Sequence, residues 1–138
     1  SEGAFVMMAF GHSKLGALPE EDVLEAIRRG CKKVSVVAHR CDEIEHSGPV
    51  TQMMLDEIRK KRFLICDLTH ERPNLYYEVG YAHGLGKEVI LTAQSDTNIH
   101  FDIANYNVIF YSSTTQLQRR LVERLKGKMT NEEKEKIT

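Results

Sequence analysis

The fold is decided by residues 63–87, FLICDLTHERPNLYYEVGYAHGLGK, which have the pattern of a buried strand, a polar turn and a helix. The first four residues are all apolar, as in a strand that helices cover on both faces. Pro73 suits the first turn of the helix, and Gly86 suits its end. The stretch therefore predicts a strand-to-helix unit in which Asp67 ends the strand and Glu78 lies on the helix.

The same alternation of apolar runs and helix-length patterns extends along the chain in both directions, as in parallel α/β sheets. The expected strands are Ala4–Phe10, Lys33–Ala38, Arg62–Cys66, Glu88–Ala93 and Val108–Tyr111. The expected helices are Pro19–Gly30, Val50–Lys61, Pro73–Gly86 and Thr114–Lys126. We therefore predict an α/β fold, a three-layer flavodoxin-like sandwich with a five-stranded, mostly parallel sheet in the order 2-1-3-4-5.

Length and charge favour a single domain without nucleic-acid or membrane partners. The chain has 138 residues and a formal net charge of −1, with 19 Lys and Arg against 20 Asp and Glu. This length supports one hydrophobic core, and a balanced charge creates no field that attracts nucleic acid or membrane. No apolar run approaches the ~20 residues of a membrane span. We expect one domain over residues 1–128 and a charged tail over residues 129–138.

The cysteines and histidines point to a reduced, cytoplasmic setting without a metal. Cys31, Cys41 and Cys66 are odd in number and form no CxxC pair. The six histidines and three cysteines show no metal-ligand spacing. No GxGxxG motif follows the first strand, and no phosphate-binding GKS or GKT loop is present, which disfavours a tightly bound dinucleotide.

Polar residues gather after the expected strands, and open α/β sheets bind ligands at the carboxyl ends of their strands. The candidates for contacts with a sugar, base or phosphate are Phe10, Gly11 and His12 after the first strand, Arg40 and Asp42 after the second, and Thr69 after the third. A simple turn at the glycine and ordinary surface positions for the two charged residues are the alternatives.

Glu78 interrupts an apolar helix face, because it shares that face with Leu75, Ala82 and Leu85. Partial burial would raise its pKa above about 4.3, which suits a nucleophile or an acid/base group. We expect the Asp67 carboxylate to lie nearby, at the mouth of the ligand-binding cleft beyond the carboxyl ends of the strands. Two carboxylates are the usual equipment for cleaving a glycosidic bond. A helix-capping or loop-bracing role for Asp67, and a structural ion pair or a partly exposed position for Glu78, are the alternatives.

A family resemblance adds to this reading. Residues 78–87, EVGYAHGLGK, preceded by DLT at 67–69, resemble the signature of the nucleoside 2-deoxyribosyltransferase superfamily. The longer pattern, with Pro73-Asn74 before the glutamate and Phe101-Asp102 before the last strand, resembles the short TIR-like or deoxyribosyltransferase-like domains of bacteria. Some of these domains cleave NAD or other nucleotides. The resemblance covers about residues 4–111.

The resemblance implies a glutamate-dependent N-glycosidase. Glu78 would face the anomeric carbon as the nucleophile, and Asp67 would bind the ribose hydroxyls. Asn74 and Asp102 would belong to the substrate-binding set, and Tyr77 would stack on a nicotinamide or purine ring or pack in the helix core. The substrate would be a nucleoside or nucleotide. No cofactor is expected, and NAD, if it binds, would be a substrate.

Two departures from the family pattern favour hydrolysis over base exchange. Asn74-Leu75-Tyr76 stands where the transferases have small residues, and Ala9-Phe10-Gly11 stands where they have a Gly-Pro turn. A true nucleoside 2-deoxyribosyltransferase and a non-catalytic nucleotide-sensing or scaffold domain are the alternatives. A flavin or phosphoacceptor domain of the same topology is less favoured. The resemblance also implies a homo-oligomer, and a sensor domain could lie outside this sequence.

Overall fold

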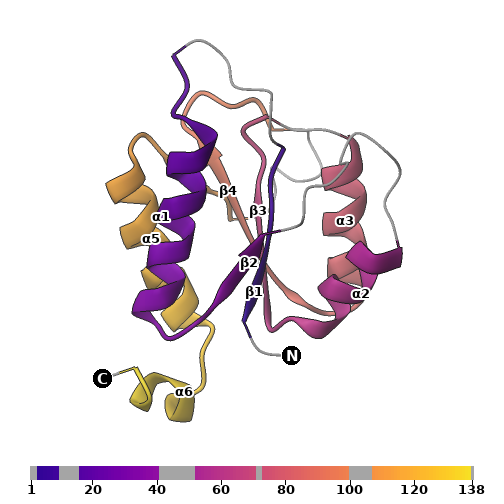
Figure 1. The fold of residues 1–138 in the computed structure, drawn as a ribbon, viewed down its shortest axis with the longest axis vertical. Coiled ribbons are helices and arrows are strands. Elements are labelled where there is room, and N and C mark those ends of the chain that lie inside the picture. The colour runs from indigo at the N-terminus through magenta and orange to yellow at the C-terminus, as the bar shows by residue number, and fades with distance from the viewer. Residues whose placement is uncertain (1–2, 10–15, 41–51, 71–72, 100–106, 138) are drawn as a thin grey trace.

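The computed structural model describes residues 3–9, 16–40, 52–70, 73–99 and 107–137, with only the backbone of residues 73 and 74. Its centre is a five-stranded sheet in the order β2-β1-β3-β4-β5, and every neighbouring pair is parallel (Figure 1). The strands are β1 (Ala4–Met7), β2 (Ala38–Arg40), β3 (Phe63–Asp67), β4 (Glu88–Gln94) and β5 (Ile109–Tyr111). The predicted fold class and strand order are confirmed.

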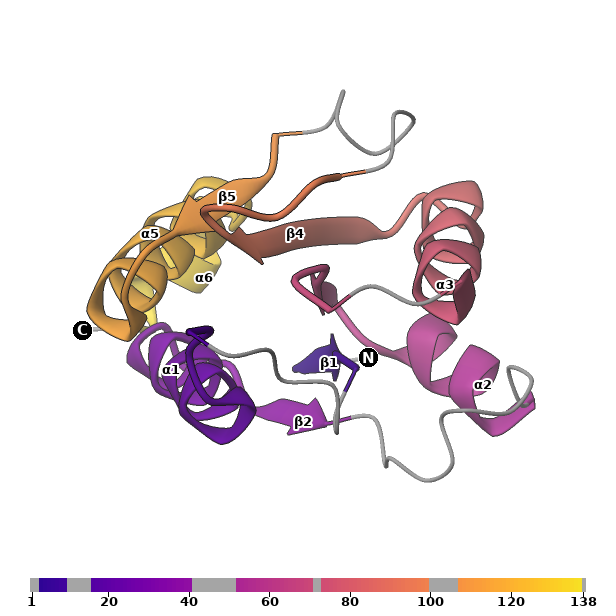
Figure 2. The same ribbon diagram turned by 90° about the horizontal axis from the view of Figure 1, so that it is seen from above.

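Helices cover both faces of the sheet (Figure 2). One face carries α1 (Glu20–Lys33) and α5 (Thr114–Gly127), and the other carries α2 (Gln52–Lys60) and α3 (Pro73–Gly84). In the described ranges, none of the helices combines the length and the apolarity that a membrane crossing requires.

The central strand β3 divides its side chains between the two layers of helices. Phe63 and Ile65 belong to the core under α1 and α5, whereas Leu64 and Cys66 belong to the core under α2 and α3. All five residues of β3 are buried, and each large apolar side chain contributes about 1.5–3 kcal/mol through burial. The same alternation directs Asp67, the last residue of β3, to the α1/α5 face.

Gly30 does not end the first helix, which continues to Lys33, so the expected end at Gly30 is wrong. Gly30 is buried against α5, where an added Cβ would lie 3.4 Å from Gln118 O and from Leu121 Cδ2. The glycine therefore allows the two helices to approach closely, and its place near the end of the apolar pattern is not a stop signal.

The expected strand Lys33–Ala38 is also corrected, because β2 begins only at Ala38. The backbone N–H of Val36 donates to Cys31 O, which closes the helix end. Ser35 has a φ of 62°, in the left-handed region that ends a helix. The buried Val34 and Val36 therefore pack in the core beyond the end of α1, and they are not part of strand β2.

The expected charged tail contains a short helix, α6 (Asn131–Glu135), which begins at Thr130 with a capping box. Met129 and Ile137, on either side of α6, pack against the α1/α5 core. The Arg62 guanidinium joins this segment to the sheet, because its Nη2 lies 2.9 Å from Lys128 O and 3.4 Å from Glu133 Oε1.

Candidate functional site

The candidate site lies at the carboxyl edge of the sheet between β1 and β3. The chain leaves β1 toward α1 on one face and leaves β3 toward α3 on the other (Figure 2). Ligands of open α/β sheets bind where neighbouring strands send their connections to opposite faces. The described residues of this edge include Met8, Ala9 and the turn from Leu68 to His70.

Asp67 forms a buried hydrogen-bonded network that joins three strands. Its Oδ2 accepts hydrogen bonds from Thr92 Oγ1 on β4 at 2.6 Å and from Tyr111 Oη on β5 at 2.7 Å. Its Oδ1 accepts one from the backbone N–H of Thr69 at 3.1 Å. Burial and the negative charge of Asp67 raise the pKa of the Tyr111 phenol, so this hydroxyl stays protonated and donates.

Asp67 and Glu78 belong to different layers of the fold. Asp67 faces the α1/α5 layer with 4% of its surface exposed, and its carboxylate is engaged by three donors. Glu78 lies on α3, on the other side of the sheet, with the apolar Leu75, Val79 and Ala82 of its own helix in the core. The bracing role, one of the two alternatives for Asp67, describes this arrangement.

Glu78 is a carboxyl group in an apolar layer. Its side chain is 2% exposed, and burial raises its pKa from 4.5 to about 7. No residue in the described part of the chain hydrogen bonds to this carboxyl group. Glu78 is therefore half protonated near neutral pH and can accept or release a proton there.

Cys66 lies close to both carboxyl groups, but it is not a reactive thiol. Burial raises its pKa well above the usual range, and the negative charges of Glu78 and Asp67 raise it further. Burial also raises the pKa of Cys31 to about 12. Because the thiolate is the nucleophile, neither described cysteine serves as a catalytic nucleophile in this state.

We expect slow labelling of these two thiols in the folded protein. In a Cys41→Ser variant, iodoacetamide should modify Cys31 and Cys66 at least about a hundredfold more slowly without urea than in urea, because burial suppresses the thiolate. Mass spectrometry of timed samples measures both rates. Equal rates in the two conditions would contradict the burial of these side chains.

His70, in the turn after β3, was not among the predicted site residues. Both of its ring nitrogens are buried, and neither has a hydrogen-bond partner among the described residues. Such an unpaired buried group costs about 1–3 kcal/mol and calls for a specific explanation. Its position directly after Asp67-Leu68-Thr69 is the sequence signal that could have drawn attention to it.

Thr69 and Gln94 brace the same edge. The backbone N–H of Gln94 donates to Thr69 Oγ1 at 2.9 Å, and Gln94 Oε1 accepts from the backbone N–H of Leu18 at 3.0 Å. These bonds connect the ends of β3 and β4 to the segment that enters α1. Thr69, predicted to contact substrate, therefore has its hydroxyl engaged by β4.

The other predicted residues are spread apart or lie outside the described residues. Arg40 ends β2, where its Nη1 lies 3.7 Å from Glu21 Oε2 on α1. Tyr77 is 58% exposed, so its ring is not in the helix core. Five predicted site residues and one side chain lie outside the described part of the chain: Phe10, Gly11, His12, Asp42 and Asp102, and the side chain of Asn74.

Comparison with known proteins finds similarity to solved structures. No protein-family model and no curated protein matches the chain. The crystal structure of a diflavin flavoprotein A3 from Nostoc sp. matches with a TM-score of 0.54 and 12% sequence identity. The match covers 92% of this chain and 99% of that chain. The fold is flavodoxin-like.

This comparison overturns the predicted function. The matching protein is a flavoprotein, so the predictions of N-glycosidic cleavage of a nucleotide such as NAD and of a domain without a cofactor are corrected. The resemblance to the nucleoside 2-deoxyribosyltransferase superfamily, enzymatic activity and a homo-oligomeric state stay predictions.

Proposed function

We propose that the domain binds a flavin nucleotide at the carboxyl edge of its sheet and acts as a redox domain. The observation that carries this proposal is the pair of buried, unpaired ring nitrogens of His70. A flavin, when bound, supplies hydride and single-electron transfer. The chain's own residues would hold and orient it.

The position of His70 supports a bound ligand. The residue follows β3 at the switch point between β1 and β3, and this is where domains with the order 2-1-3-4-5 bind flavin mononucleotide. A flavin nucleotide offers phosphate and ring oxygens that would accept hydrogen bonds from an imidazole N–H. A partner for His70 would remove the cost of burying its nitrogens without hydrogen bonds.

The charges of the site also suit a phosphate-bearing ligand. Glu78, with a pKa of about 7, is uncharged in about half of the molecules at neutral pH. The Asp67 carboxylate accepts three hydrogen bonds within the α1/α5 layer. Protonation of Glu78 and the three hydrogen bonds to Asp67 therefore reduce the negative charge that a phosphate would meet at this edge. The flavoprotein with the matching fold is the second support for a flavin.

Flavin binding is tested first on the purified protein. We expect a visible flavin absorption spectrum, or, after the flavin has been removed, a rise in melting temperature when flavin mononucleotide is added. At a ligand concentration one hundred times the Kd, binding adds about 2.7 kcal/mol to the free energy of unfolding. Riboflavin, AMP and NAD at the same concentration are the comparison ligands. Stabilisation by AMP or NAD without stabilisation by any flavin would overturn the proposal.

His70→Leu tests the residue that carries the proposal. The loss of a buried hydrogen bond to a charged group should weaken flavin binding about tenfold or more, whereas the ligand-free protein keeps its stability because no hydrogen bond is lost. His39→Leu, on the exposed side of β2, is the matched control and should bind flavin as the wild type does. Unchanged flavin affinity in His70→Leu, measured by fluorescence titration, would contradict the proposed site.

A further inference from the structure

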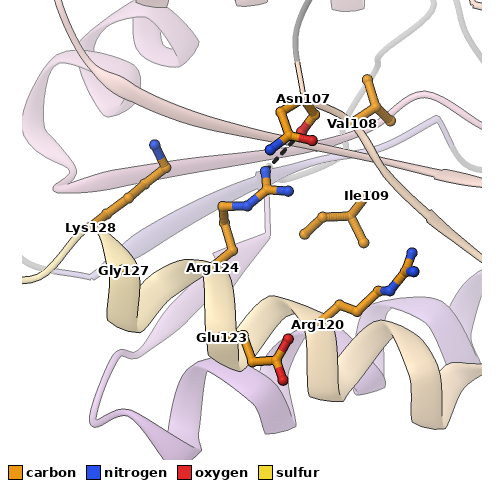
Figure 3. Close-up of a pocket in the computed structure, with 8 residues that line it drawn as sticks. All are labelled: Asn107, Val108, Ile109, Arg120, Glu123, Arg124, Gly127 and Lys128. Atoms are coloured by element: carbon orange, nitrogen blue, oxygen red, sulfur yellow. Dashed lines mark hydrogen bonds between the residues drawn. The ribbon is translucent and has the colours of Figure 1, made fainter.

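A cleft lies beside the edge strand β5, away from the candidate site (Figure 3). Its volume is about 650 Å³, and its walls come from residues 107–109 and from α5 between Arg120 and Lys128. The cleft adjoins the amino end of β5 and the second half of α5, so it is separate from the carboxyl edge where His70 lies.

Two cations of α5 and Lys128, the residue directly after this helix, line the cleft in a row. Arg120, Arg124 and Lys128 are spaced four residues apart, which places them on one helix face at intervals of about 6 Å. Figure 3 shows Arg124 and Lys128 extending from the helix toward the strand, whereas the Glu123 carboxylate points the other way. Glu123 Oε2 instead lies 3.9 Å from Arg119 Nη1.

The positive charge of the cleft comes from the two guanidinium groups, because Lys128 Nζ is paired with Glu88 Oε1 at 3.0 Å. Arg120 Nη1 donates to Phe110 O at 2.6 Å, and Arg124 Nη1 donates to Asn107 O at 2.8 Å. In the described ranges, neither arginine forms an ion pair with an acidic side chain. A guanidinium has five N–H groups, so most of its donors are available to a ligand. Burial and the positive charge of the nearby Arg120 lower the pKa of Arg124.

The cleft also borders an open sheet edge. β5 is the last strand of the sheet, and Ser95 N donates to Tyr111 O on the β4 side. Backbone groups of successive residues alternate in direction, so the N–H and C=O of Phe110 face away from β4. The Phe110 side chain is 39% exposed. An edge strand of this kind can pair with another extended chain.

We propose that this cleft is a docking site for an extended, acidic peptide segment of a partner protein. Carboxylates two residues apart on an extended peptide are about 6.6–6.8 Å apart, which matches the spacing of the cations on α5. Arginine binds a carboxylate through two parallel hydrogen bonds. The segment would run along the groove between α5 and β5, where its carbonyl can accept a hydrogen bond from the Phe110 N–H, because the Phe110 carbonyl already accepts one from Arg120.

The arrangement favours several carboxylates over one phosphate. Arg120 and Arg124 lie one helical turn apart along α5, whereas tight binding of one phosphate needs donors that converge on it. The C-terminal half of α5 also carries the negative end of the helix dipole, which disfavours a compact dianion there. Single carboxylate charges that are spread along a peptide are repelled less by this end of the helix dipole.

The test uses a fluorescent ten-residue peptide in which Glu and Thr alternate. We expect saturable binding by fluorescence anisotropy, weaker at high salt, and at least tenfold weaker in the Arg120→Glu/Arg124→Glu double variant. The matched control is Arg119→Glu, an exposed α5 position whose side chain faces Glu123, and it should change the affinity less than threefold. Arg120→Gln/Arg124→Gln removes the charges but keeps amide donors for the strand carbonyls, and it should also bind at least tenfold more weakly. It serves as the test pair if the Glu variant does not fold.

Four results would overturn the proposal. They are no binding of the alternating peptide, equal weakening by Arg119→Glu, equal binding of a peptide with the same composition whose Glu residues form one block, and full displacement of the peptide by an equal concentration of pyrophosphate. The last result would assign the cleft to a phosphate ligand. Selective loss of binding in the Arg120 and Arg124 variants would establish the acidic-peptide site.

Discussion

Replacing Asp67 with alanine is expected to lower the free energy of unfolding by about 3–5 kcal/mol, because three hydrogen-bond donors lose their acceptor. The change removes the acceptor for the hydroxyls of Thr92 and Tyr111 and for the backbone N–H of Thr69. A buried donor without an acceptor costs about 1–3 kcal/mol. Urea unfolding followed by circular dichroism measures the loss as a lower midpoint.

Two further variants distinguish the stability lost with the hydrogen bonds of Asp67 from the stability lost when side-chain volume is removed. Tyr111→Phe removes one donor and keeps the ring in the core, so it should cost less than Asp67→Ala, about 1.5–3 kcal/mol. Asp56→Ala, on the surface of α2, removes an exposed carboxylate and should cost under about 1 kcal/mol. A loss below 1 kcal/mol for Asp67→Ala would show that the network does not stabilise the sheet.

Replacing Glu78 with glutamine is expected to stabilise the protein at alkaline pH. The pKa of Glu78 is about 7 in the folded chain and 4.5 in the unfolded chain, so the folded state binds the proton more tightly. At 1.36 kcal/mol per pKa unit, ionising this buried group costs roughly 3 kcal/mol of stability. Glutamine keeps the shape and cannot ionise.

The pH profile gives the sign of this effect. The contribution of the protonated Glu78 is fully present below pH 4.5, declines as the pH rises, and is lost above about pH 7. The difference in unfolding free energy between Glu78→Gln and wild type should therefore grow from pH 4.5 to about pH 8. Urea midpoints across this range measure it, and Glu25→Gln, at an exposed position of α1, should give a flat difference. A flat difference for Glu78→Gln would mean that Glu78 is not buried as described.

The strand order and the inward position of Glu78 could be predicted from the sequence, because both depend on local patterns. Uninterrupted apolar strands alternating with amphipathic helices determine the layers, and helical spacing places Glu78 with Leu75 and Ala82, which are buried. Leu85, predicted on the same face, is 42% exposed, because α3 ends at Gly84.

The partners of Asp67 could not be predicted in the same way. Strand alternation alone puts Cys66 and Asp67 on opposite faces, but the meeting of Asp67 with Thr92 and Tyr111 depends on the register of β3, β4 and β5. The sequence separations are 25 and 44 residues, so no local pattern reports these contacts. The unpaired nitrogens of His70 are likewise a property of the packed structure.

The hydrogen bond of the Tyr111 hydroxyl attaches the short strand β5 to the centre of the sheet. β5 has only three residues, so its backbone forms few hydrogen bonds with β4, yet the Tyr111 side chain is bound to a carboxylate on the central strand. Fraying of this edge therefore requires breaking a buried contact at the middle of the molecule. The edge strand shares the stability of the core, and the cleft beside it keeps its shape without a partner.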